Sequence, residues 1–269
     1  MGPAPERSFY NACINNIIAR SSGGASGRRP LRFVGAVEVT PLPSVNIFPT
    51  TVFHELLGLE APARQQMSQT ILDMQQARQA RANSHNTWTG DIYGASDLHL
   101  QDDFEPLVTR LRESVNSYFS SFGFDSGDLQ MHITRCWGTV GLPNQSIKPH
   151  QHLNSHLSIV YYPDDSCQDT DLTFHNRHPQ PSNISIPGMY MPLNLQKRVQ
   201  PNPLLSPEIQ LPVAEDMIIV FPSNITHAVH PNRSSRPRVS IAIDTFFTLR
   251  SDVDDEEFFL PPLDKWRAV

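Results

Sequence analysis

The sequence predicts an α+β fold, with helices in the first half of the chain and an all-β unit in the second. Two observations predict it. Apolar residues between positions 103 and 122 recur every three and four residues, the spacing of a helix with one wide apolar face. From Gln130 onwards the apolar residues instead form short, β-branched runs bounded by turn residues. A jelly roll would bring the ends of such strands together around a central cavity.

The spacing of apolar residues, glycines and prolines predicts the following helices, linkers and strands along the chain. A short helix at 7–19 is followed by a Ser/Gly-rich linker at 21–27, and prolines confine 31–53 to edge strands. Met67, Ile71 and Met74 predict a helix over 63–81. Strands are predicted at 130–137, 157–162, 171–174, 217–221 and 239–249. We therefore divide the chain into an N-terminal extension (1–45), a main domain (46–249) and an acidic C-terminal tail (250–269).

Composition narrows the classes of function. The formal net charge is −6 and basic residues are scattered among acidic ones, which disfavours nucleic acid and anionic membranes as partners. No apolar run approaches the length of a membrane span. Three cysteines without metal-type spacing fit a reducing compartment, so we expect a cytoplasmic protein. The acidic tail either docks as a strap or pairs two subunits in a homodimer.

Three histidines form the strongest candidate for a metal site. His150 and His152 are two residues apart, so an extended strand would point both side chains to the same side. His227 follows another apolar run, and an antiparallel neighbour would deliver it to the same point. Three imidazole nitrogens can hold one face of a metal ion and leave its other positions open.

The order of motifs resembles that of the 2-oxoglutarate- and Fe(II)-dependent oxygenase family over roughly three quarters of the chain. In sequence, the motifs are Asn46-Ile-Phe-Pro-Thr50, Trp88, Trp137, His150-Gln-His152, Asn154-Ser155, Leu157-Ser158, Tyr161-Tyr162, Asp216-Met-Ile-Ile-Val-Phe-Pro222, His227-Ala-Val229, Pro231 and Arg238-Val-Ser-Ile-Ala242. The resemblance implies a double-stranded β-helix, a cupin-like jelly roll, that holds Fe(II) and 2-oxoglutarate. One departure is that His152 stands where the broader superfamily usually carries an acid. It is either a third ligand or an outer partner of the metal.

Further site residues follow from the chemistry of 2-oxoglutarate. A guanidinium can fix its distal carboxylate with two parallel hydrogen bonds, and Arg238 with Ser240 is similar to the carboxylate clamp of several iron oxygenases. Arg236 is a competitor, and a surface position for Arg238 is the alternative. Strand alternation places Asn154, Ser158 and Tyr162 on the face of the histidines, as candidates to bind cosubstrate or substrate.

The resulting hypothesis is a dioxygenase that uses Fe(II), 2-oxoglutarate and dioxygen to oxidise a small amino-acid-like or secondary metabolite, most simply by hydroxylation. Desaturation and ring closure begin in the same way. The alternatives are a three-histidine cupin-type dioxygenase that does not use 2-oxoglutarate, and a non-catalytic barrel that binds a metal or small ligand. The proline-rich stretch 167–212 is expected to cover the barrel mouth.

Overall fold

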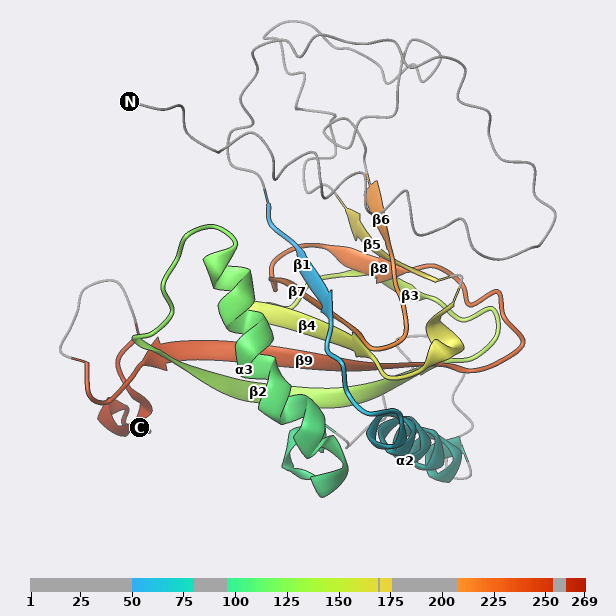
Figure 1. Ribbon diagram of the computed structural model, residues 1–269, viewed down its shortest axis with the longest axis horizontal. Coiled ribbons are helices and arrows are strands. Elements are labelled where there is room, and N and C mark those ends of the chain that lie inside the picture. Colours follow the sequence, from blue (N-terminus) through green and yellow to red (C-terminus); the bar gives the residue numbers. More distant parts are fainter. Residues whose placement is uncertain (1–49, 80–95, 169, 176–207, 254–259) are drawn as a thin grey trace, which may run out of the picture. The chain divides into compact units, whose positions relative to one another are not determined.

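Two antiparallel sheets form the framework of the computed structural model, which describes residues 50–79, 96–168, 170–175, 208–253 and 260–269 (Figure 1). One sheet has the strand order β1-β7-β4-β9-β2 and the other β3-β8-β5-β6. The strands are β1 (Phe53–Leu56), β2 (Leu129–Gly141), β3 (Ile147–His150), β4 (Leu157–Tyr162), β5 (Asp171–His175), β6 (Glu208–Pro212), β7 (Met217–Pro222), β8 (His227–Val229) and β9 (Arg238–Leu249).

The pairing of these strands identifies the topology. Strand β2 pairs with β9, β3 with β8, β4 with β7 and β5 with β6, all antiparallel. The strands β2 to β5 therefore form one side of a ribbon, and β6 to β9 return along it as the other side. Pairs β4·β9 and β5·β8 join successive turns of the ribbon. A ribbon of two strands wound in this way is a double-stranded β-helix, which confirms the predicted fold.

Two helices cover the outer face of the five-stranded sheet. They are α2 (Ala61–Gln79) and α3 (Glu105–Ser120), and Figure 1 shows α3 lying across the sheet that contains β4, β9 and β2. Met67 and Ile71 of α2 and Leu107 and Leu111 of α3 are fully buried in one cluster with the sheet. The predicted packing of helices on the sheet is confirmed for these two, whereas the helix predicted at 7–19 lies outside the described residues.

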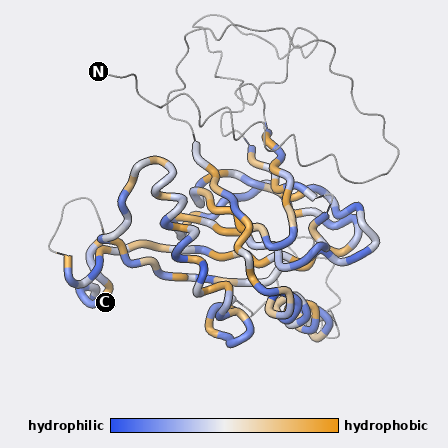
Figure 2. The backbone as a smooth tube through the Cα atoms, in the orientation of Figure 1, coloured by the Kyte–Doolittle hydropathy of each residue, from blue (hydrophilic) through white to orange (hydrophobic). Residues whose placement is uncertain are grey.

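Strand β4 separates two apolar layers. Tyr161 belongs to the cluster beneath the helices, and Tyr162 belongs to a second cluster enclosed between the two sheets. This alternation follows from the period of two along a strand. Figure 2 shows the corresponding hydrophobic segments running along the strands, while much of α2 is hydrophilic. None of the helices in the described ranges has the length and hydropathy of a membrane span.

A β-bulge in β2 changes which side chains face the cavity between the sheets. Ile133 pairs with Thr245 and Arg135 with Asp244, so Thr134 is an extra residue in the ladder. Before it, odd-numbered residues such as Ile133 pack beneath the helices; after it, Cys136 takes that face. Bulges shift the alternation by one residue in this way. The odd-numbered residues after Thr134 consequently line the cavity.

The prediction of one even-numbered face from His150 to Tyr162 holds only within β4. Strand β3 ends at His150 and β4 begins at Leu157, so the chain between them is not extended strand. His156 stacks on Phe246 on the outside, with 4.4 Å between ring centroids. The boundaries predicted for the N-terminal extension and the acidic tail stay predictions, because 1–49 and 254–259 are outside the described residues.

Candidate metal centre

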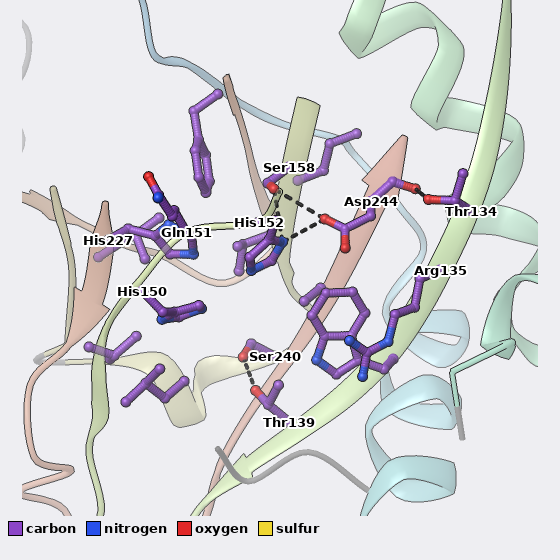
Figure 3. A pocket seen from close by; sticks show the side chains of 18 of the residues that line it. Thr134, Arg135, Thr139, His150, Gln151, His152, Ser158, His227, Ser240 and Asp244 are labelled. Atoms are coloured by element: carbon purple, nitrogen blue, oxygen red, sulfur yellow. Dashed lines mark hydrogen bonds and ion pairs between the residues drawn. The ribbon is translucent and has the colours of Figure 1, made fainter. Parts of the chain in front are cut away.

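Three imidazoles converge where β3 and β8 meet. His150, the last residue of β3, pairs in register with His227, the first residue of β8. Their ring centroids are 4.3 Å apart, and each lies 5.2 Å from the ring of His152, which follows β3 by two residues. One nitrogen from each of the three lies within 4.8 Å of the others. Figure 3 shows the three rings facing one another at one side of the cavity.

Hydrogen bonds select the nitrogen that each ring presents. The Nδ1 atom of His150 is 2.8 Å from the carbonyl oxygen of Lys148, and Nδ1 of His227 is 2.9 Å from that of Ile225. A carbonyl oxygen can only accept, so both Nδ1 atoms carry the proton and donate it. The third Nδ1, on His152, is 2.6 Å from a carboxylate oxygen. Each ring can therefore present Nε2 to a metal ion, as histidine ligands held by an outer acceptor do.

His227 is kept neutral by its surroundings. Its side chain is 4% exposed and Phe221 packs against its ring edge-on, at 4.9 Å. Burial, followed by repulsion from His150, lowers the pKa of His227 to about 3. Desolvation disfavours the charged imidazolium, so His227 offers a lone pair at neutral pH.

An acid that the sequence reasoning missed, Asp244 of β9, supports the cluster. Its Oδ1 accepts hydrogen bonds from His152 Nδ1 at 2.6 Å, Ser158 Oγ at 3.1 Å and Ser155 Oγ at 3.2 Å. Every second residue of a strand faces the same side, so Asp244, four residues after Ser240, was predictable as a residue on the cavity face with Arg238 and Ser240. Its hydrogen-bond partner could not be recognised from the sequence, because His152 lies 92 positions away. Figure 3 shows the carboxylate directed at His152.

Arg238 occupies the same cavity as the histidines. It is 3% exposed, and its guanidinium makes a hydrogen bond of 3.4 Å to the carbonyl oxygen of His230. Among the described residues, no carboxylate lies within ion-pair distance of it. Burial lowers the pKa of Arg238 from its ordinary value. A buried cation without a counter-ion is costly, so the cavity is suited to an anion at this point.

Gly141 makes room for that guanidinium. It lies opposite Arg238 in the β2·β9 ladder, and a Cβ at Gly141 would stand 3.0 Å from a terminal nitrogen of Arg238. Any larger residue would have to push the guanidinium aside. Arg236, the competitor, is exposed instead and pairs with Asp165 at 3.2 Å. The surface alternative for Arg238 is therefore wrong.

The remaining predicted residues lie around the same cavity, which has a volume of about 480 Å³ and is lined from both sheets. Tyr162 is 2% exposed beside Arg238. Ser240 also lines the wall, and its hydroxyl pairs with that of Thr139. Ser158 is engaged with Asp244 and His152. Asn154 lines the cavity as an exposed residue. A volume of this size is typical of pockets for small molecules.

The cavity wall on β2 carries two further side chains, Arg135 and Trp137. The guanidinium carbon of Arg135 stands 4.2 Å from the centroid of the Trp137 ring. That ring lies 5.6 Å from His152. The other tryptophan of the motif set, Trp88, lies outside the described residues.

A protein-family model matches the segment that carries this site. Residues 135–244 match the model of a family described as "Putative 2OG-Fe(II) oxygenase". No curated protein sequence matches the chain. Similar solved structures include a prolyl-4-hydroxylase from Pseudomonas putida, with 15% identity, a TM-score of 0.43, and coverage of 75% of this chain and 94% of that one.

Two others come from nogalamycin biosynthesis. The carbocyclase SnoK shares 13% identity at a TM-score of 0.48, over 75% of this chain and 82% of its own. The epimerase SnoN, in complex with Fe³⁺, α-ketoglutarate and nogalamycin RO, shares 12% identity at a TM-score of 0.48, over 79% and 91%. Similarities at this level indicate neither a substrate nor a reaction. The segment that matches the 2OG-Fe(II) oxygenase family model, 135–244, contains the three histidines and Arg238.

Proposed function

We propose that the protein is a non-haem Fe(II)- and 2-oxoglutarate-dependent dioxygenase that hydroxylates an unactivated carbon of a small amino-acid-like or secondary metabolite. The observation that carries this proposal is the presence, in one cavity, of three histidines with one nitrogen each within 4.8 Å of the others, and of a buried Arg238 without a described carboxylate partner. The first set suits a divalent metal ion. The second suits the distal carboxylate of a keto acid.

His150, His152 and His227 would hold Fe(II) through their Nε2 atoms. Three neutral imidazoles contribute no negative charge to the metal, unlike a set with one carboxylate. Asp244 offsets part of this difference, because its carboxylate accepts the Nδ1 hydrogen of His152 and so increases the basicity of that ligand. His152 can thus serve as a metal ligand while the acid stays outside the coordination sphere.

The chain's other residues would bind and orient the cosubstrate. Arg238 would hold its distal carboxylate, and Gly141 leaves space for the guanidinium. Tyr162 and Ser240 lie on the adjoining wall and would complete the carboxylate site. Ser158, by its hydrogen bonds, orients His152 and Asp244, and exposed Asn154 would contact the substrate. Fe(II) and 2-oxoglutarate, when bound, supply the oxidation, in which dioxygen is consumed and succinate and carbon dioxide are released.

The test is an anaerobic titration of Fe(II), with and without 2-oxoglutarate, followed by air and a panel of small metabolites with succinate as the readout. We expect a visible charge-transfer band that needs both additions, and succinate formation that one metabolite class stimulates. Arg238→Gln should raise the 2-oxoglutarate concentration required by roughly 10- to 100-fold, the value of a charge-assisted bond. Arg236→Gln removes an exposed arginine and is the matched control.

Two outcomes would replace the proposal. If Arg238→Gln leaves oxygen consumption intact and no succinate forms, the protein is a three-histidine dioxygenase whose substrate binds the metal directly. If Fe(II) and 2-oxoglutarate together give no charge-transfer band, the barrel has a non-catalytic role in binding a metal or small ligand.

A further inference from the structure

Arg135 is a cavity residue that the proposed roles leave unused. It lies on β2 and lines the cavity together with the histidines, and Figure 3 shows it on the side of the view away from His227. The side chain is exposed. No carboxylate of the described ranges lies within ion-pair distance of its guanidinium, although Asp244 is its partner in the ladder. The carboxylate of Asp244 is instead engaged with His152.

The orientation of Arg135 depends on the bulge. Without the extra residue Thr134, the alternation that buries Leu129, Met131 and Ile133 beneath the helices would continue to Arg135. A charge would then be driven into the apolar layer, at a high desolvation cost. The bulge instead turns Arg135 and Trp137 into the cavity. Bulges beside active sites commonly redirect a side chain in this way.

Trp137 holds the guanidinium in place next to the metal centre. Its ring stacks under Arg135 at 4.2 Å and lies 5.6 Å from the ring of His152. Stacking on an indole restricts a long side chain while its N–H donors remain available at the edge of the guanidinium. One indole ring therefore separates an anion-binding group from a proposed metal ligand.

The guanidinium groups of Arg135 and Arg238 lie at different points of the cavity. Asp244, opposite Arg135, is six positions from Arg238 along β9, which corresponds to about 20 Å in a strand. The guanidinium of Arg238 stays beside Gly141, whereas that of Arg135 lies over Trp137. The cavity thus offers a second, separate position for an anion.

We infer that Arg135 binds a carboxylate group of the substrate that the protein oxidises. The apolar part of this substrate lies against Trp137 and Leu153. Leu153 lines the same cavity and is 78% exposed, as a contact surface for hydrocarbon would be. The substrate class is therefore an amphipathic carboxylate, such as an N-acylated apolar amino acid. This inference rests on the proposed function for its meaning, but its binding site can be tested without turnover.

The test compares two probes, N-acetyl-L-leucine and its carboxamide, which differ in the charged group. Their affinities are measured by calorimetry on full-length protein, both metal-free and with Fe(II) and saturating 2-oxoglutarate under anaerobic conditions. We expect the carboxylate to bind roughly 10- to 100-fold more tightly than the amide, as a charge-assisted hydrogen bond allows. Arg135→Gln should abolish that preference, Arg135→Lys should keep part of it, and Arg236→Gln should leave it unchanged.

The inference is overturned if the wild-type protein binds neither probe or binds both equally, or if Arg135→Gln keeps the preference. It is also overturned if Arg238→Gln, and not Arg135→Gln, removes carboxylate binding, because the anion then occupies the other position. Failure of the proposed function gives a different result. In that case 2-oxoglutarate does not bind, but the metal-free protein still distinguishes the two probes through Arg135.

Discussion

Asp244 provides the sharpest test of how the proposed metal centre is built. Its carboxylate is 13% exposed and accepts hydrogen bonds from His152, Ser155 and Ser158. Asp244→Asn keeps an acceptor oxygen but removes the negative charge, and Asp244→Ala removes both. Loss of an outer partner of a histidine ligand typically costs 10- to 100-fold in metal affinity. At about 1.4 kcal/mol for each factor of ten, this is ~1.4 to ~2.8 kcal/mol.

A charge-assisted hydrogen bond contributes a similar amount, about 1.5–3 kcal/mol, so the two estimates agree. We therefore expect Asp244→Asn to weaken Fe(II) binding by roughly tenfold and Asp244→Ala by roughly 100-fold. The assay is an anaerobic competition between the protein and a chromophoric chelator of known affinity. Thermal unfolding of the metal-free variants checks that each retains its fold.

Asp165→Asn is the matched control, because it also removes one negative charge but from a side chain that is 47% exposed and pairs with Arg236. It should leave Fe(II) affinity unchanged. If the two asparagine variants bind Fe(II) equally well, the role given to Asp244 is refuted. If Asp244→Ala binds as tightly as the wild type while remaining folded, the carboxylate does not support Fe(II) binding through His152.

Three further predictions concern packing, burial and the backbone. A Cβ at Gly138 would stand 2.8 Å from Ile71, so Gly138→Ala should lower the free energy of unfolding, measured with denaturant, by about 1–3 kcal/mol. The double variant with Ile71→Ala should lose less free energy of unfolding than the sum of the two single variants. Burial raises the pKa of Cys136 and of Cys167 to about 12, so at pH 8 roughly one thiol in ten thousand is ionised. Peptide mapping should therefore find both cysteines unlabelled by a thiol reagent until the protein unfolds. Labelling of the native protein would contradict their burial. Asp216 accepts hydrogen bonds from a buried tyrosine hydroxyl at 2.8 Å and from a backbone amide at 2.7 Å, and its own backbone has a φ of 64°. Asp216→Ala should therefore lower the unfolding free energy by about 2–4 kcal/mol. Asp216→Asn should cause a smaller loss.

Local sequence determined the helices and most of the strands. The three- and four-residue repeat that predicts a helix over 103–122 corresponds to α3, Glu105–Ser120, because residues at that spacing lie on one face only in a helix. The strand predicted at 239–249 corresponds to β9, Arg238–Leu249. Residue type, together with the two-residue spacing of His150 and His152 and the position of His227 after an apolar run, was also enough to select the three histidines among eleven.

Tertiary structure decided which side chains meet. The cavity position of Arg135 depends on the bulge at Thr134, which exists only as a register shift against β9. The contact between His152 and Asp244 joins residues 92 positions apart. A period of two predicts the faces of one strand only until a bulge or a strand end resets it. The sequence by itself determined the kinds of element and the candidate ligands, whereas strand pairing determined their partners, because pairing depends on residues distant along the chain.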